Sequence, residues 1–198
     1  MGFRRGPAVR PGRRSPGSGR ALSHARGGFT LAETAIATLI LVVAVGGLTG
    51  SILAGMKLSR TNSEQARAEA EARAMLARIE GTAFAAVFAT FNADPADDPG
   101  GAGTAHGSGF DVTGMTAPEG DPDGLVGEIL FPIDAVPGVL REDVTDPAFN
   151  MPRDLNGDGN VDALDHSDDY VVLPVRVRLS WTGASGPRSL ERSVILVQ

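Results

Sequence analysis

Hydrophobic residues gather in one long run near the start of the chain. Between Phe29 and Met56 the only charged side chain is Glu33, and residues 34–56 carry no charge. The apolar side chains of this run would surround a helix on all sides rather than form one stripe. At 1.5 Å per residue such a helix is about 35 Å long, which exceeds the roughly 30 Å hydrocarbon core of a bilayer. We therefore expect residues 29–56 to form a membrane-spanning helix.

The pattern beyond Met56 is that of an exposed helix. Residues 57–80 are rich in Ala, Glu and Arg, which all favour helices, and Glu69 forms an i,i+4 pair with Arg73. The membrane helix should therefore continue unbroken to about Glu80, so that residues 57–92 hold its extracytoplasmic continuation and one further short helix.

That short helix is predicted by a change of pattern after residue 80. Gly81 should interrupt the first helix, and Thr82 is expected to act as the new N-cap. The apolar spacing i, i+3, i+4, i+7 then predicts an amphipathic turn that packs on a core, formed by Phe84, Val87, Phe88 and Phe91.

Residues 170–198 alternate between apolar and polar side chains as a half-buried β-hairpin does. The alternation places on one face Val175, Val177, Leu179 and Trp181, and on the other face Arg176, Arg178 and Ser180. A turn at residues 183–187 leads into a second predicted strand at 188–198. Pro174 lacks a ladder donor, so the first strand should lie at an edge or be bulged near its start.

The intervening residues 93–169 are loop-like and acidic. Gly, Pro and Asp are frequent, and residues 94–169 hold 18 acidic against two basic side chains. We therefore predict an α+β fold in which a long N-terminal membrane-spanning helix packs on a small C-terminal antiparallel sheet, because each element buries the face that the other exposes.

Charge divides the chain into two parts. Residues 1–28 hold seven Arg and no acidic side chain, which gives +7 there against −13 for the rest. This basic segment has few apolar residues and should be disordered, a nucleic-acid tail or a transit peptide being the alternatives. The acidic bulk would repel phosphate and excludes a uniformly basic nucleic-acid-binding domain. With zero Cys, a disulfide framework, a thiolate zinc site and a cysteine nucleophile are excluded as well.

A recognisable motif stands at this charge boundary. The chain reads G-G-F-T-L-x-E directly before the apolar run, which comprises Gly27, Gly28, Phe29, Thr30, Leu31 and Glu33. The junction resembles the N-terminus of type IV prepilins and of the pseudopilins of type II secretion, over residues 24–55. The resemblance implies a pilin-like fold, and it implies that a prepilin peptidase cleaves after Gly28, removes residues 1–28 as a leader and methylates Phe29. The small sheet without a disulfide is similar to that of minor pilins or minor pseudopilins.

Glu33 matches the glutamate at the fifth position of the mature family members. In the family this glutamate is thought to pair with the N-terminal amine of a neighbouring subunit and to set the register of the stacked helices. A carboxylate in a membrane helix costs about a few kcal/mol, so its presence calls for such a partner. The alternative is that Glu33 lies in the headgroup region beside Arg26.

Small residues recur within the apolar run. Gly46 and Gly50 form G-x-x-x-G, and Gly47 with Ser51 repeats the spacing, which permits close approach of another helix during assembly. The alternative is that these glycines soften the helix, since this stretch of pilins can lose helical order during assembly.

Two other export signals do not fit the sequence. A signal-peptidase site needs small residues at −3 and −1, but Ile52 precedes Ala54 and Leu53 precedes Gly55 at these positions. A lipoprotein anchor needs a Cys, which the chain lacks.

A second motif lies in the acidic region. Residues 154–165 (DLNGDGNVDALD) match the twelve-residue calcium loop of an EF-hand, with Gly159 at the sharp turn of position 6. The candidate ligands at loop positions 1, 3, 5, 7 (by its carbonyl), 9 and 12 are Asp154, Asn156, Asp158, Asn160, Asp162 and Asp165. Asp at position 12 resembles dockerin loops, although dockerins have two loops and only one is visible here. These hard oxygen ligands predict a structural Ca²⁺, the alternative being an Asp/Asn/Gly turn on an acidic surface.

The sequence contains no catalytic motif that we recognise. His24, His106 and His166 are dispersed, and residues 100–109 are Gly-rich but lack the G-K-[ST] ending of a phosphate-binding loop. No G-x-S-x-G nucleophile elbow occurs either. We therefore do not expect an enzyme.

The resemblance implies a structural subunit, namely a minor pilin or pseudopilin of a type IV pilus-like or type II secretion filament. Arginines on the N-terminal flank place that end in the cytoplasm and the C-terminal domain outside the inner membrane, before assembly into a filament. The expected partners are prepilin peptidase, other pilins or pseudopilins, the inner-membrane assembly machinery and membrane lipid, without nucleic acid. The alternative is a membrane-anchored extracytoplasmic calcium-dependent binding module, in which residues 94–169 recognise a partner.

Overall fold

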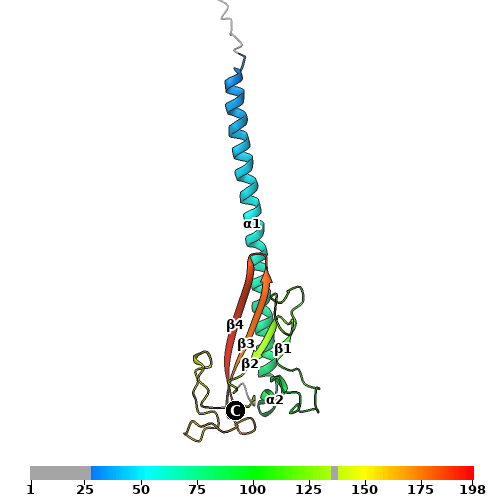
Figure 1. Cartoon of the computed structure of the whole chain (residues 1–198), viewed down its shortest axis with the longest axis vertical. Coiled ribbons are helices and arrows are strands. Elements are labelled where there is room, and N and C mark those ends of the chain that lie inside the picture. The colour runs from blue at the N-terminus through cyan, green and yellow to red at the C-terminus, as the bar shows by residue number, and fades with distance from the viewer. Residues whose placement is uncertain (1–27, 135–137) are drawn as a thin grey trace, which may run out of the picture. The chain divides into compact units, whose positions relative to one another are not determined.

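The computed structural model describes residues 28–134 and 138–198, which divide after Gly47 into two compact units. One α-helix, α1 (Leu31–Glu80), runs unbroken through 50 residues, as the sequence predicts (Figure 1). The other large element is a four-stranded antiparallel sheet. The architecture is therefore α+β, with a long N-terminal apolar helix and a small sheet.

The first turn of α1 is closed by a local hydrogen bond. The hydroxyl of Thr30 accepts from the backbone N–H of Glu33 at 3.2 Å, in the S/T-x-x-E arrangement that marks helix starts. This bond satisfies one of the four N–H groups that a helix leaves without an internal partner. The helix consequently begins at Leu31, two residues after Phe29.

The N-terminal part of α1 exposes its apolar side chains on every side. None of its most hydrophobic 18-residue window is buried, and α1 is the one helix among residues 28–134 and 138–198 that is long and apolar enough to cross a membrane. Leu39, Ile40 and Val43 illustrate this, being exposed by 64%, 64% and 67%.

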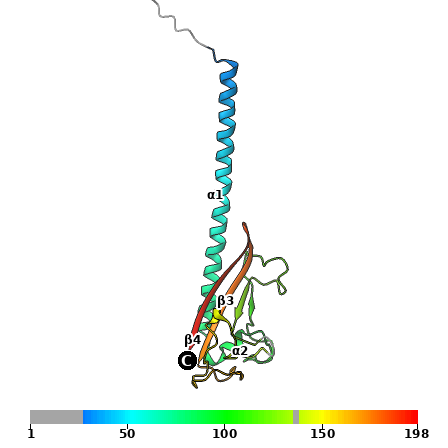
Figure 2. The same cartoon turned by 60° about the vertical axis from the view of Figure 1, so that its left-hand side comes forward.

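The C-terminal half of α1 buries a single stripe instead. The buried positions repeat every three, four or seven residues and are Thr61, Ala68, Ala72, Met75 and Ile79. Ala68 and Ala72 are completely inaccessible, so the backbone of the sheet lies close to the helix at this level. Figures 1 and 2 show the two long strands lying along this half of α1.

The sheet has the order β1-β2-β3-β4 with every neighbouring pair antiparallel. Its strands are β1 (Gly109–Phe110), β2 (Gly127–Leu130), β3 (Val172–Gly183) and β4 (Gly186–Val197). β3 and β4 form the predicted hairpin, whose turn consists of Ala184 and Ser185. Gly186 has φ +104°, a conformation that favours glycine and that permits this tight return.

The predicted apolar face of β3 is confirmed. Val175, Val177 and Leu179 are completely buried and Trp181 is 2% exposed, on the face that carries the core. β3 lies inside the sheet, but β2 pairs only with residues 176–179 of it. At Pro174 β3 pairs only with β4 within the described sheet, so its other side has no strand partner there. This agrees with the expectation that the strand lies at an edge near its start.

One residue on the opposite face of β3 is buried against expectation. Arg176 is only 8% exposed because the 3-10 helix η2 (Pro147–Phe149) covers it, with its guanidinium 4.2 Å from the centre of the Phe149 ring. The carboxylates of Asp146 and Glu191 lie 3.8 and 3.6 Å from its nitrogens. This cation is therefore part of the packing rather than of a solvent face.

The short helical segment after α1 forms as predicted, except for its cap. It consists of η1 (Phe84–Ala86) and α2 (Val87–Phe91), and it buries Val87, Phe88 and Phe91. The N-cap is Ala83, without a side-chain bond, so the prediction for Thr82 was wrong. The Thr82 hydroxyl instead donates to the carbonyl of Arg78 at 3.0 Å, because a residue just past a helix end can reach back to the last turn.

Residues 93–169 are mostly loops but also supply half of the strands. β1 and β2 both lie in this region, which the sequence predicted only as loop-like. Phe110 lies across β2 at Gly127, where a Cβ would clash with its ring. Strands of two and four residues that contain glycine leave no readable alternation, which explains why the sequence did not indicate them.

Candidate functional site

The predicted processing site lies in an exposed, irregular segment. Gly28 and Phe29 belong to neither helix nor strand, and Phe29 is 81% exposed. Gly27 and the remainder of the predicted leader lie outside the described residues. An exposed segment outside regular secondary structure is the kind of site at which proteolysis concentrates.

Glu33 lies in the first turn of α1 and is exposed. Its negative charge is favourable there, because the N-terminus of a helix carries a partial positive charge. Across residues 28–134 and 138–198 no cation forms an ion pair with its carboxylate. Arg26, which the alternative places beside Glu33, lies outside the described residues.

Gly46 and Gly50 lie within α1, which continues through both of them. A Cβ built on either glycine would meet no atom within 4 Å. Both positions therefore present bare backbone, and packing and softening both stay predictions for them.

The predicted calcium loop is closed by its own side chains. Asp154 at position 1 accepts hydrogen bonds from the N–H groups of Gly157 and Gly159 at 2.6 and 2.8 Å. Asn156 and Asp158 each accept from the residue two further on, at 3.0 and 2.7 Å. Gly159 has φ +87°, as the sharp turn at position 6 requires.

The last two predicted ligands lie on the way out of this loop. Asp162 accepts from the N–H of Leu164 at 2.7 Å, a bond that together with His166 lowers the pKa of its carboxyl. Asp165 accepts from the N–H and the hydroxyl of Ser167 at 2.9 and 2.5 Å. Asn160, whose carbonyl was predicted at position 7, is exposed.

A buried glutamate that the sequence did not indicate holds this loop. Glu142 is 1% exposed, and its Oε1 accepts from the N–H groups of Leu155 and Asn156 at 2.6 and 3.2 Å. Its Oε2 accepts from the N–H of Asp162 at 3.2 Å. The side chain therefore joins the entering and leaving limbs of the loop. No local pattern marks Glu142, since its partners begin 13 residues further along the chain.

His166 completes the cluster. Its Nδ1 lies 2.9 Å from Asp169 Oδ1, and its Nε2 lies 3.2 Å from Asp162 Oδ1 and 3.7 Å from Glu142 Oε2. Burial disfavours the charged ring, but hydrogen bonds to Asp169 and Asp162 and the charge of Glu142 outweigh it and raise the pKa of His166. Carboxylates only accept, so this geometry favours a ring that carries protons on both nitrogens.

The side chains of Glu142, Asp162 and His166 are close enough together to hold a metal ion. Among the described residues they are the one group of three acidic or histidine side chains whose potential ligand atoms all lie within 4.8 Å of one another. Asp162 belongs to the predicted calcium ligands, whereas Glu142 and His166 do not. The oxygen-rich side chains of residues 154–165 match the chemistry that Ca²⁺ prefers.

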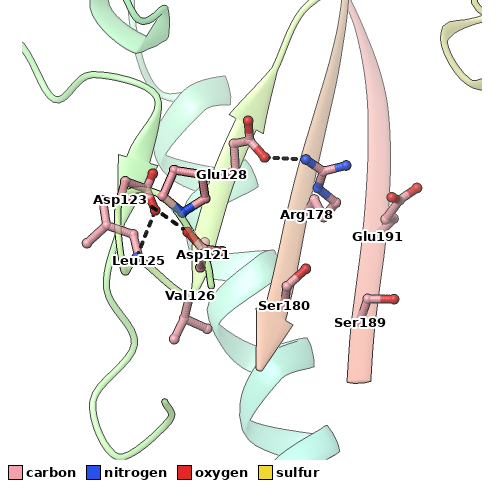
Figure 3. Close-up of a pocket in the computed structure, with 11 residues that line it drawn as sticks. Asp121, Asp123, Leu125, Val126, Glu128, Arg178, Ser180, Ser189 and Glu191 are labelled. Carbon is pink, nitrogen blue, oxygen red and sulfur yellow. Dashed lines mark hydrogen bonds and ion pairs between the residues drawn. The ribbon is translucent and has the colours of Figure 1, made fainter. Parts of the chain in front are cut away.

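A polar groove lies on the sheet face opposite α1 and has a volume of about 630 Å³ (Figure 3). Arg178 of β3 pairs with Glu128 of β2 across its floor. At its rim the N–H of Leu125 and a hydrogen bond to Asp121 lower the pKa of Asp123. Ser180 and Ser189 line the groove, but none of the described residues that line it is a histidine that could activate a hydroxyl.

The remaining histidine of the described chain, His106, packs between aromatic rings. Its ring centre lies 5.5 Å from that of Phe91 and 6.4 Å from that of Phe110. His24 lies outside the described residues.

Comparison with known proteins assigns none of these features. No protein-family model, no curated protein and no solved structure matches this chain. The function must therefore be inferred from the residues themselves.

Proposed function

We propose that this chain is a structural, non-enzymatic minor pilin or pseudopilin with a pilin-like fold, a subunit of a type IV pilus-like or type II secretion filament. Prepilin peptidase would cleave the Gly28–Phe29 bond of a precursor in the inner membrane and methylate Phe29. The observation that carries the proposal is the G-F-T-L-x-E junction leading directly into one helix of 50 residues. Other pilins or pseudopilins and the inner-membrane assembly machinery would be its partners.

The division of labour along α1 supports this role. Large apolar side chains from Leu31 to Leu58 are more than half exposed, a surface that a soluble monomer rarely carries. Lipid would cover it in the membrane, and neighbouring helices would cover it in a filament. Beyond Leu58 the same helix buries only one stripe in its own domain.

Glu33 fits the same proposal. Its carboxylate has no ion-pair partner within residues 28–134 and 138–198, and cleavage after Gly28 would create a free amine at Phe29. In a filament the amine of one subunit would pair with Glu33 of the next. Such a pair offsets the cost of placing a carboxylate among apolar helices.

Calcium is proposed as a structural ion in this subunit. Residues 154–165 carry the ligand types and the turn glycine of a calcium loop, and only residues 166–171 separate them from β3. A bound ion would neutralise part of the acidic excess and hold the loop in one conformation. The proposed effect is on stability rather than on signalling.

Intact mass and N-terminal sequence of the chain co-expressed with a prepilin peptidase test the proposal. We expect a chain that starts at Phe29 and is about 14 Da heavier because of one methyl group. Gly28→Ala should abolish cleavage, whereas Gly27→Ala, one residue further from the bond, serves as the matched control and should be cut. An intact Met1 chain, or cleavage after Gly55, would contradict the proposal.

The alternative, a membrane-anchored calcium-dependent binding module, makes a different prediction for the same variants. Loss of processing in Gly28→Ala, or of assembly in Glu33→Gln, would leave binding of a partner by residues 94–169 intact. Under the filament proposal both variants lose incorporation into filaments, which co-purification with the other subunits measures.

A further inference from the structure

The end of the uncharged run is followed at once by two cations on one face of α1. Leu53, Met56, Lys57 and Arg60 stand at i, i+3, i+4 and i+7, so their side chains share a face. The first two are apolar and exposed by 61% and 53%, and the other two are charged and exposed. Along this face the surface therefore changes from apolar to cationic within one turn of helix.

A pocket of about 280 Å³ lies on this face. It is lined by Leu53, Met56, Lys57, Arg60 and Ala184. Ala184 comes from the turn between β3 and β4, so the tip of the hairpin forms the wall opposite the helix. The pocket thus combines an apolar part, a cationic part and a backbone wall.

The hairpin tip is held at this level by specific contacts with α1. The N–H of Ala184 lies 3.2 Å from both oxygens of the Glu64 carboxylate, and the hydroxyls of Ser185 and Thr61 are 3.2 Å apart. A Cβ at Gly183 would meet the end of the flexible Glu64 side chain, which would have to shift to admit it. These contacts hold the wall of the pocket in place.

Both cations are free to bind a ligand. Within the described residues neither the Lys57 nor the Arg60 side chain forms a hydrogen bond or an ion pair, whereas Arg67 donates to the carbonyl of Thr113 and Arg73 pairs with Glu69. The Glu64 carboxylate, one turn further on, is engaged by the hairpin. The chain after residue 28 is strongly acidic overall, so the two positive charges of Lys57 and Arg60 stand out against it.

We propose that this pocket binds one anionic phospholipid. The phosphate would lie between Lys57 and Arg60, the glycerol and upper acyl chain would cover Leu53 and Met56, and the hairpin tip would close the side. Charge complementarity and continuity with the apolar surface of α1 favour this occupant over a soluble anion. The inference rests on the proposed insertion of α1 in a membrane, and it adds a specific lipid class and the residues that select it.

Native mass spectrometry of the membrane-inserted chain, processed at Gly28 or not, and released from nanodiscs, tests the proposal. Discs of phosphatidylglycerol and of phosphatidylcholine are compared, and the number of lipids retained per chain is counted. We expect one phosphatidylglycerol to be retained preferentially. Each cation near a membrane surface contributes about 1 kcal/mol, so the double variant Lys57→Gln/Arg60→Gln should weaken retention roughly tenfold or more.

Arg78→Gln is the matched control, because Arg78 is exposed on the same helix, carries the same charge and lies far from the pocket. It should retain phosphatidylglycerol as the unmodified chain does. Equal retention of the two lipids, or equal loss in the double variant and in Arg78→Gln, would overturn the proposal. Complete displacement by inorganic phosphate would overturn it too, because it would reveal an anion site without a lipid contribution.

The outcome is separable from that of the proposed function. A chain that is not processed at Gly28 but still retains phosphatidylglycerol through Lys57 and Arg60 would contradict the filament role alone. A chain that is processed and assembled but shows no lipid preference would contradict the lipid site alone.

Discussion

Replacement of Glu142 by glutamine tests whether this buried carboxylate holds the acidic loop. The carboxylate accepts three backbone hydrogen bonds, two at Oε1 and one at Oε2, and is 1% exposed. Glutamine has nearly the same shape, but it offers one acceptor oxygen and one NH₂ group. If the amide oxygen keeps the hydrogen bonds from the N–H groups of Leu155 and Asn156, the NH₂ group faces the N–H of Asp162. Two donors then point at each other and neither has an acceptor.

The expected cost follows from these contacts. A hydrogen bond to a charged group is worth about 1.5–3 kcal/mol, and the two bonds that remain lose the contribution of the charge. We therefore expect Glu142→Gln to lower the free energy of unfolding by about 3 kcal/mol. For a domain of this size that corresponds to a fall in Tm of roughly 6–12 °C.

Circular dichroism of the detergent-solubilised full chain during heating measures this shift. Glu71→Gln is the matched control, because Glu71 is exposed on α1 and should change Tm by no more than about 1 °C. If Glu142→Gln melted within the same margin as the control, the reasoning that Glu142 anchors the loop would be refuted.

Three further predictions concern pH, calcium and packing. Burial raises the pKa of Tyr170, so the stability that its protonated phenol contributes is present below pH 10.0 and is lost as pH rises through the folded-state pKa. Because Tyr170 is the only tyrosine, phenolate absorbance follows it alone. Titration at the unperturbed pKa would contradict the burial argument. Millimolar Ca²⁺ should raise Tm and a chelator should lower it, the effect being lost in Asp154→Asn and kept in Asp168→Asn, and an unchanged melting curve would count against a structural ion. Ala72→Leu should lower the free energy of unfolding by about 1–3 kcal/mol, because Ala72 is completely buried under the sheet. Ala74→Leu, on the exposed side of the helix, should be nearly neutral in the same melting assay. Equal Tm values for the two variants would refute the close helix–sheet contact.

The elements that the sequence predicted well are those whose pattern is local. The long helix was readable from an uncharged run followed by helix-forming residues, and the β3–β4 hairpin was readable from strict alternation around Val177. Both patterns repeat over many residues, so a few ambiguous positions do not hide them. The cap at Thr82 was misjudged because one side chain can serve either of two adjacent helices.

The acidic region shows the opposite case. β1 and β2 together contain six residues, and β2 pairs with β3, more than 40 residues away along the chain. Arg176 was expected on an exposed face, but η2 folds over it and buries it against Phe149. Partners this distant in sequence leave no trace in a local window.

The sequence by itself determined where the chain is apolar enough to enter a membrane, where the motif stands that predicts a processing site, and which loop residues offer oxygen to a cation. These properties depend on residue type and on spacing within a few turns. Only the tertiary structure decided that Glu142 and His166 join the acidic loop, and that the hairpin tip meets α1 beside Lys57 and Arg60. The reason is that burial and convergence of side chains arise from packing between segments that are distant along the chain, and no single segment contains that information.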